Sequence, residues 1–167
     1  MHEKSIELLN RAVADELLAV HQYMYFHFQC DDQGFELLST LFRRVAIEEM
    51  MHVEMLAERI LFLGGEVDMT VGGEVQYLHE VQRMLELAKK MELSSAQDYN
   101  KWANESSANA DSNSKKLFER LVDDEERHFD LYDTEVRNLE QFGAQYLALQ
   151  SIERSKSRSS TPSASSQ

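Results

Sequence analysis

Glu49-Met50-Met51-His52 and Glu125-Glu126-Arg127-His128 are two copies of one pattern, in which a histidine follows a glutamate by three positions. Residues three apart lie on the same face of a helix, so each copy presents a carboxylate and an imidazole side by side. A solitary glutamate, Glu16 or Glu92, precedes each copy by 33 residues. Four glutamates and two histidines form a candidate ligand set for two metal ions, and their oxygen and nitrogen donors suit iron, manganese or zinc.

Long segments without glycine or proline dominate the chain. The six glycines lie where a helix could break, and the single proline, Pro162, lies close to the C-terminus. Four uninterrupted stretches remain, at about residues 3–31, 35–63, 81–109 and 115–142. Their apolar residues recur at spacings of three and four, which is typical of amphipathic helices, and no convincing β alternation is present. The sequence therefore predicts an all-α protein.

Each of the four segments carries a polar interruption in the middle of its apolar row. In the first segment the row is Ile6, Leu9, Val13, Glu16, Val20, Tyr23, His27 and Cys30. The corresponding interruptions in the other rows are Glu49 with His52, Glu92, and Glu125 with His128. An unpaired carboxylate in a core costs several kcal/mol, and no row contains a lysine or arginine. Two divalent cations are the simpler partner, and the alternative is pairing of the acids with the histidines or with other basic groups.

The connections between segments suggest how the four interruptions meet. Residues 64–80 are too many for a tight turn, so they can carry the chain along the bundle and make the next helix parallel to the last. One such crossover is a feature of ferritin-like four-helix bundles. If the first two segments fold back near residue 33, and the last two near residue 109, all four interruptions reach the same height. A short amphipathic helix at residues 144–152 follows the fourth segment.

Composition narrows the class of protein. The chain has 17 basic and 30 acidic residues and a net charge of −13, which argues against nucleic-acid binding. Cys30 is the only cysteine, so neither an internal disulfide nor a thiolate metal cage is expected. No apolar run is long enough to span a membrane and no targeting pattern precedes the first helix, so we expect a soluble, cytoplasmic protein. We divide it into a di-iron domain at residues 1–153 and a Ser-rich flexible tail at residues 154–167.

The spacing also predicts a role for each ligand. Glu49 and Glu125 are positioned to bridge two metals, and each of the two histidines to cap one of them. The upstream glutamates, Glu16 and Glu92, become terminal ligands. Tyr23 and Tyr99 lie two turns from these terminal ligands, either as core residues or as partners of the site. A pair of Fe(II) ions can reduce dioxygen or peroxide, so Fe(II) oxidation is the expected chemistry.

The sequence resembles the ferritin superfamily, and the bacterioferritins most closely. The resemblance covers about residues 4–153 and is densest in 15–17, 47–52, 58–63 and 124–130. It implies a ferroxidase that stores iron inside a shell of two dozen identical subunits, built from two-fold dimers. It also implies two iron ions per subunit, with the catalytic and metal-binding positions at Glu16, Glu49, His52, Glu92, Glu125 and His128.

The resemblance further implies a haem b shared by each pair of subunits, with Met50 as its axial ligand. Met50 lies off the buried row, and we expect it to face outward with Ile47 and Val53. The alternative is that this methionine only packs at a dimer interface. Arg43 and Arg44 depart from the family, because they stand where bacterioferritins often have an aromatic residue and a histidine.

Three other functions compete with this interpretation. The first is a twelve-subunit, Dps-like mini-ferritin that protects against peroxide and iron stress, although the short fifth helix and the six ligands within one chain favour the larger shell. The second is a rubrerythrin-like oxidase, whose additional iron module needs four cysteines. The third is a haem-binding or structural bundle without metal chemistry.

Overall fold

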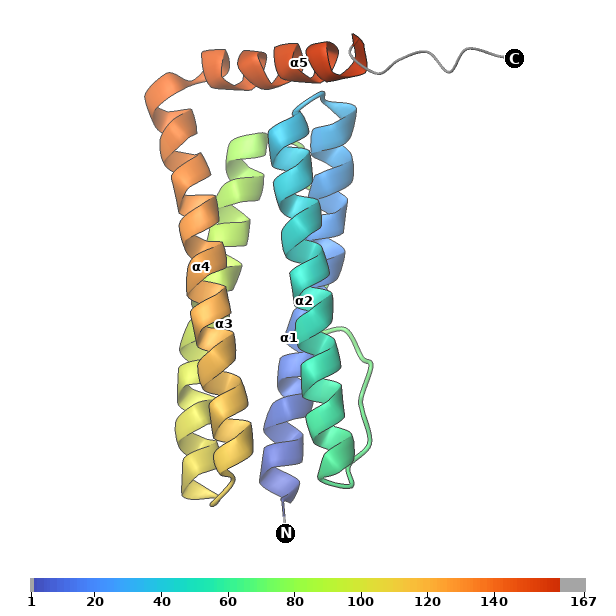
Figure 1. The fold of residues 1–167 in the computed structure, drawn as a ribbon, viewed down its shortest axis with the longest axis vertical. Helices are drawn as coiled ribbons and strands as arrows, with labels where there is room; N and C mark the ends of the chain where they lie inside the picture. Colours follow the sequence, from blue (N-terminus) through green and yellow to red (C-terminus); the bar gives the residue numbers. More distant parts are fainter. Residues whose placement is uncertain (1, 160–167) are drawn as a thin grey trace, which may run out of the picture.

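The computed structural model describes residues 2–159, which form five helices and no strands. The helices are α1 (Glu3–Asp32), α2 (Glu36–Phe62), α3 (Val81–Ala108), α4 (Ser112–Phe142) and α5 (Ala144–Ser159). Helix α1 packs along α2 and α3 packs along α4. Figure 1 shows the two pairs standing side by side, with α5 lying across one end. The prediction of an all-α four-helix bundle with a fifth C-terminal helix is confirmed.

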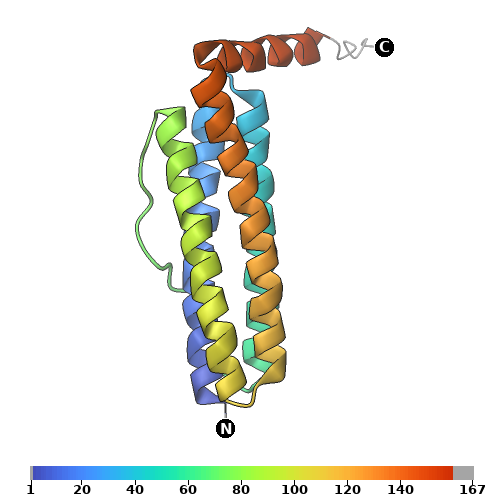
Figure 2. The ribbon, with the colours of Figure 1, turned by 90° about the vertical axis from the view of Figure 1, so that its left-hand side faces the viewer.

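Residues 63–80 form the long crossover between α2 and α3. They run along the outside of the bundle, so that α2 and α3 point in the same direction (Figures 1 and 2). The side chain of Gln22 binds this segment by accepting from the backbone N–H of Gln76 at 2.7 Å and donating to its carbonyl at 2.9 Å. Gly72 donates its N–H to the carbonyl of Ala14, and a Cβ at Gly72 would lie only 2.8 Å from that oxygen. A glycine is therefore needed where the crossover touches α1.

The apolar core consists of two clusters separated along the bundle axis. One cluster lies nearer α5 and is built around the aromatic residues Tyr23, Phe26, Phe42 and Tyr132. The other lies nearer the N-terminus and includes Leu9, Leu56, Tyr99, Trp102 and Phe118. Burial of each large apolar side chain contributes about 1.5–3 kcal/mol, so the two clusters hold the four helices together above and below their middle. The polar interruptions of the sequence occupy the layer between the clusters.

Two predictions of which side chains face the core or the solvent are wrong. Phe26 is fully buried, whereas the predicted row member His27 is only half-buried and its Nδ1 lies 2.9 Å from the carbonyl of Ser39. Phe26 and His27 follow the buried Tyr23 by three and four residues, so both fit the spacing of the apolar row and the spacing does not choose between them. Val53, expected on the outer face beside Met50, is also buried, and it packs in the cluster nearer the N-terminus.

Helix α5 is longer than the segment predicted at residues 144–152. Gly143, with φ of 57°, makes the turn out of α4, and the helix continues to Ser159. Arg154 anchors it by donating to the carbonyl of Asp31 and lying 3.7 Å from the carboxylate of Glu36. Residues 154–159, predicted to belong to a flexible tail, are therefore helical, and Arg154 joins them to the bundle end. Residues 160–167 lie outside the described part of the chain, and the domain boundary at residue 153 stays a prediction.

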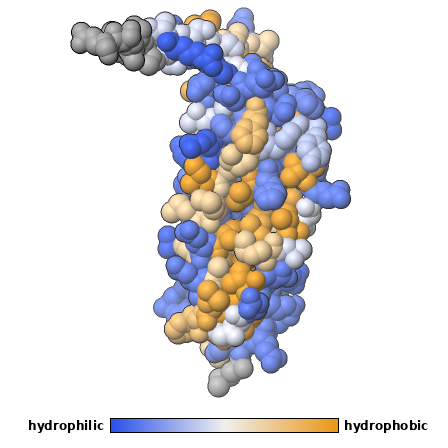
Figure 3. Space-filling view, turned by 90° about the vertical axis from the view of Figure 1, so that its right-hand side faces the viewer, coloured by the Kyte–Doolittle hydropathy of each residue, from blue (hydrophilic) through white to orange (hydrophobic). Residues whose placement is uncertain are grey.

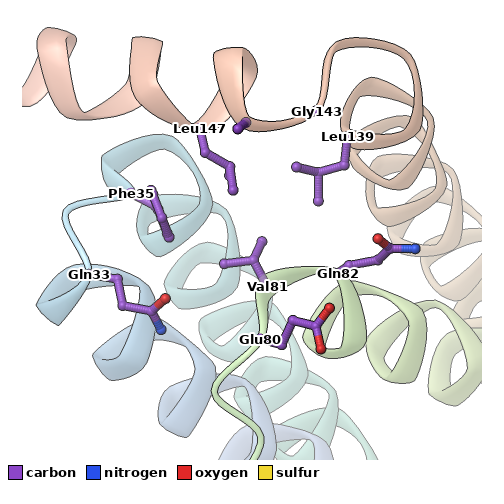
Figure 4. Close-up of a pocket in the computed structure, with 9 residues that line it drawn as sticks. Gln33, Phe35, Glu80, Val81, Gln82, Leu139, Gly143 and Leu147 are labelled. Carbon is purple, nitrogen blue, oxygen red and sulfur yellow. The ribbon is translucent and has the colours of Figure 1, made fainter.

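A cavity of about 350 Å³ lies where α5 crosses the bundle (Figure 4). Its lining includes Phe35, Val81, Leu139 and Leu147. These side chains are apolar and belong to the end of the bundle, far along the helices from the polar middle layer, so the cavity is separate from the candidate site.

None of the helices in residues 2–159 is both long and apolar enough to cross a membrane.

Candidate metal centre

The polar middle layer brings together all six residues that the sequence singled out. Each of the four long helices contributes one glutamate, and α2 and α4 each add a histidine one turn further on. None of the six residues is more than 2% exposed: Glu16, Glu49, His52, Glu92, Glu125 and His128. The side chains lie at one height along the bundle because the turn between α1 and α2 is midway between Glu16 and Glu49. The turn between α3 and α4 is likewise midway between Glu92 and Glu125.

The Nδ1 atom of His52 lies among three carboxylates. It is 3.2 Å from Oε1 of Glu16, to which it is hydrogen-bonded, and 2.7 Å from Oε2 of Glu49. Oε1 of Glu125 lies 3.2 Å from the same nitrogen. These four residues therefore offer one nitrogen and three oxygens to a common point.

The Nδ1 atom of His128 has a matching environment. It is hydrogen-bonded to Oε1 of Glu49 at 3.1 Å, and Oε2 of Glu92 lies 3.4 Å away. Glu125 completes this second group, so that Glu49 and Glu125 belong to both groups and each histidine to only one. The two imidazole rings stack with their centroids 5.9 Å apart. This sharing of two carboxylates is the arrangement expected of two adjacent metal ions with bridging glutamates.

Three carboxylate oxygens in this layer have no hydrogen-bond partner within residues 2–159. They are Oε2 of Glu49, Oε2 of Glu92 and Oε1 of Glu125. A nitrogen that carries a single hydrogen serves one acceptor well, so each Nδ1 satisfies one oxygen and leaves its other neighbours without a donor. Buried oxygens without a donor are costly, and a divalent cation satisfies several of them at once. The donor set thus fits two such ions, and oxygen and imidazole ligands fit iron.

Two buried tyrosines orient the glutamates that belong to only one group. The Tyr99 hydroxyl donates to Oε1 of Glu16 at 2.5 Å, and the Tyr23 hydroxyl donates to Oε1 of Glu92. Each bond links helices of different pairs, α1 to α3, and fixes one carboxylate oxygen. The two tyrosines are therefore partners of the site as well as core residues.

The outer nitrogens of the histidines meet a second set of acids that the sequence interpretation missed. Nε2 of His52 lies 3.1 Å from Oδ2 of Asp124, and Nε2 of His128 lies 2.7 Å from Oε2 of Glu48. A signal for these acids was present, because each copy of the pattern has an acid directly before its glutamate. A partner on the outer nitrogen fixes the orientation of a metal-binding imidazole and leaves the inner nitrogen free to ligate.

The carboxylates titrate abnormally in the metal-free protein. Burial, reinforced by the negative charge of Glu49, raises the pKa of Glu16 to about 8 and also raises the pKa of Glu92 and Glu125. Burial acts in the same direction on Glu49, but the imidazoles of His128 and His52 outweigh it and lower the pKa of this carboxyl. Glu49 is therefore the carboxylate that remains ionised most readily.

The histidines are protonated to unusually high pH. Burial alone would lower the pKa of each, but the surrounding carboxylates reverse the shift and raise it to about 10 for His52 and about 11 for His128. In the metal-free site, protons therefore balance the buried negative charge. Two divalent cations would balance four ionised carboxylates completely, and would take the place of these protons.

Comparisons with known proteins point to one family. A family model described as a ferritin-like domain matches residues 6–142. The bacterioferritin of Desulfovibrio desulfuricans is 34% identical over 145 residues, a match that spans 87% of this chain and 81% of the relative. That of Brucella melitensis is 33% identical over 140 residues, spanning 84% of this chain and 87% of the relative.

A solved structure agrees with these matches. The crystal structure of the Desulfovibrio desulfuricans bacterioferritin, described as showing its diiron site in different catalytic states, superposes with a TM-score of 0.87 at 32% sequence identity. The superposition covers 98% of this chain and 91% of that chain. The similarity therefore extends over the whole bundle and includes α5.

We expect binding of Co(II) or Zn(II) to the metal-free protein to release protons and to weaken as the pH falls. Groups with a raised pKa hold their protons at neutral pH, and ligation requires them to lose these protons, so acid competes with the metal. Calorimetric titrations in buffers of different ionisation enthalpy, between about pH 6 and pH 8, measure the protons released. The variant Glu125→Gln should release fewer, and the exposed control Glu54→Gln on α2 should match the parent. Metal binding without proton release would contradict the proposed site.

Proposed function

The chain belongs to the bacterioferritin family of the ferritin superfamily, and from this premise we propose that it stores iron by oxidising Fe(II) at the six-residue centre and depositing Fe(III) within a protein cage. The observation that carries the proposal is the buried layer of four glutamates and two histidines, whose unsatisfied oxygens suit two divalent cations. The proposed activity is that of a ferroxidase, an Fe(II):oxygen oxidoreductase.

Each ligand has a role that follows from its place in the layer. Glu49 and Glu125 belong to both groups and would bridge the two ions, and His52 and His128 would each bind one through Nδ1. Glu16 and Glu92 would be the terminal ligands.

The tyrosines prepare the terminal ligands for binding. The bonds from Tyr99 and Tyr23 hold one oxygen of each terminal carboxylate. The other oxygens need less rearrangement when an ion arrives, because the chain positions them beforehand.

Oxidation of Fe(II) at this centre needs an electron acceptor, which is O₂ or H₂O₂. When bound, two Fe(II) ions supply two electrons, which with two protons reduce O₂ to H₂O₂ or reduce H₂O₂ to two molecules of water. The protein would contribute a buried site for two adjacent ions, lined by residues that are at most 2% exposed. Release of Fe(III) then returns the carboxylates and imidazoles to their protonated state.

Assembly is the second part of the proposal. We propose a shell of two dozen subunits, formed from two-fold dimers, in the cytoplasm. Helix α5 supports the larger shell over a twelve-subunit, Dps-like particle, because it projects across the bundle end and leaves Leu149 and Ile152 exposed for a neighbouring subunit. Native mass spectrometry distinguishes the two assemblies of this 19.4 kDa subunit, since a particle of 24 subunits is twice as heavy as one of 12.

A haem b at the two-fold interface completes the proposal. The face seen in Figure 3, on the side of α1, α2 and the crossover, carries an extended run of apolar side chains. On α2, Met50 is 50% exposed and Ile47 is 37% exposed, so the thioether of Met50 is available to a group outside its own subunit. A second copy of the chain would supply the second Met50 and cover the apolar surface.

Replacement of a bridging carboxylate tests the ferroxidase. Glu49→Ala should slow aerobic Fe(II) oxidation by at least about 100-fold, because it removes one oxygen ligand from each ion. The measurement is the appearance of ferric absorbance after Fe(II) is mixed with the protein in air. The control is Glu54→Ala, which changes an exposed glutamate on the same helix. Oxidation by Glu49→Ala at the parental rate would exclude this centre as the ferroxidase.

Replacement of the axial thioether tests the haem. Protein reconstituted with haem b should show the absorption of a bis-methionine haem, with one haem for each pair of chains, and Met50→Ala should lose it. Met51 is the control, because it is adjacent on α2 and similarly exposed, at 53%. If Met51→Ala loses the haem and Met50→Ala keeps it, the ligand assignment is wrong.

A further inference from the structure

Arg127 lies between the two acids that hold the outer histidine nitrogens. Its guanidinium Nη2 donates to Oε2 of Glu48 at 2.5 Å and to Oδ1 of Asp124 at 3.4 Å. Glu48 is on α2 and Asp124 is on α4, so this one side chain links the two helices that supply the Glu-x-x-His pairs. Neither the sequence interpretation nor the proposed function gives Arg127 a role.

The contacts of Arg127 lead directly to the buried centre. The same Oε2 atom of Glu48 that accepts from Arg127 lies 2.7 Å from Nε2 of His128. Asp124 uses its second oxygen, Oδ2, to contact Nε2 of His52 at 3.1 Å. A carboxylate thus links each imidazole to the same guanidinium, and Nη2 of Arg127 also lies 3.4 Å from Nε2 of His128 itself.

A surface ion pair alone would give Arg127 little importance. Its side chain is 48% exposed, and exposed ion pairs contribute only about 0–1 kcal/mol to stability. The acids are less exposed, at 26% for Glu48 and 29% for Asp124, and the histidine side chains are at most 3% exposed. This network begins at the surface and ends on two buried imidazole rings. Its effect on the orientation of those rings is therefore more important than the energy of its exposed ion pairs.

We propose that Arg127 is a positioning residue for the metal centre, and that it holds Glu48 and Asp124 against the outer nitrogens of the two histidines. An acid that accepts the N–H of an outer nitrogen fixes the ring and leaves the lone pair of Nδ1 for the metal. A guanidinium suits this task because its planar set of N–H groups can serve two carboxylates at once. Arg127 thereby fixes both Nδ1 atoms toward the four glutamates through a single side chain.

Because Arg127 is positively charged, the direction in which its replacement changes metal affinity distinguishes a charge effect from a positioning effect. A cation close to a metal site repels the metal, so removal of the charge alone would tighten metal binding. Loss of positioning acts in the opposite direction, because replacement of an outer partner of a metal ligand typically weakens binding by about 10–100-fold. The inference rests on the proposed function, since it requires that the six residues bind metal.

The test is titration of metal-free protein with Co(II), followed by absorption spectroscopy and calorimetry. The parent should bind two Co(II) ions per chain. Arg127→Gln should bind the same number at least about 10-fold more weakly, with a changed visible absorption of the bound Co(II). Arg127→Lys keeps the charge but not the planar fork, so its affinity should lie between the two. The control Arg120→Gln removes an exposed arginine from the same helix and should leave both readouts unchanged.

A second background shows whether Arg127 acts through the acids. In a variant that already carries Glu48→Gln and Asp124→Asn, Arg127→Gln should cause no further loss of Co(II) affinity. Unchanged or tighter binding by Arg127→Gln in the parental background would overturn the positioning role while leaving the metal centre in place. Failure of the parent itself to bind two Co(II) ions would instead overturn the proposed function.

Discussion

Four glutamates buried at one height of the bundle need positive charge, and this need governs the rest of the structure. Two histidines lie among them, and no lysine or arginine is among the buried side chains of residues 2–159. Transfer of an unpaired carboxylate from water into a protein interior costs several kcal/mol, so the layer is stable only with bound protons or bound cations. In the metal-free protein, raised pKa values of Glu16, His52 and His128 supply the protons. The same groups become ligands when divalent cations replace those protons.

The scaffold keeps the four glutamates together by stabilising the bundle on both sides of the polar layer. Aromatic clusters around Phe42 on one side and Phe118 on the other hold the four helices at fixed distances. The crossover makes α2 and α3 parallel, so the two Glu-x-x-His pairs come from helices that run in opposite directions. The tyrosines follow the same symmetry: the hydroxyl of Tyr99 on α3 donates to Glu16 on α1, and that of Tyr23 on α1 donates to Glu92 on α3. Each terminal glutamate is therefore held by a tyrosine from another helix, which pre-organises its carboxylate for metal.

The helix order, the crossover and the six central residues could be predicted because they depend on spacing along the chain. A polar residue in an apolar row is visible without coordinates, and equal distances from two turns place such residues together. The partners of the ligands depend on contacts between helices. The sequence therefore contains only weak signals for the acids at Glu48 and Asp124, and none for the link through Arg127. The inward position of Phe26 was missed because spacings of three and four after Tyr23 fit both Phe26 and His27. The extension of α5 beyond residue 152 depends on the contacts of Arg154 with the bundle end.

The most direct measurement of the central layer is anomalous X-ray diffraction from crystals of the protein loaded with iron or cobalt. Two anomalous peaks should appear in every chain, both in the middle of the four-helix bundle, with Glu49 and Glu125 between them. Bound metal only at surface carboxylates, with the buried histidines still paired to protonated glutamates, would contradict the assignment of this layer as a two-metal centre.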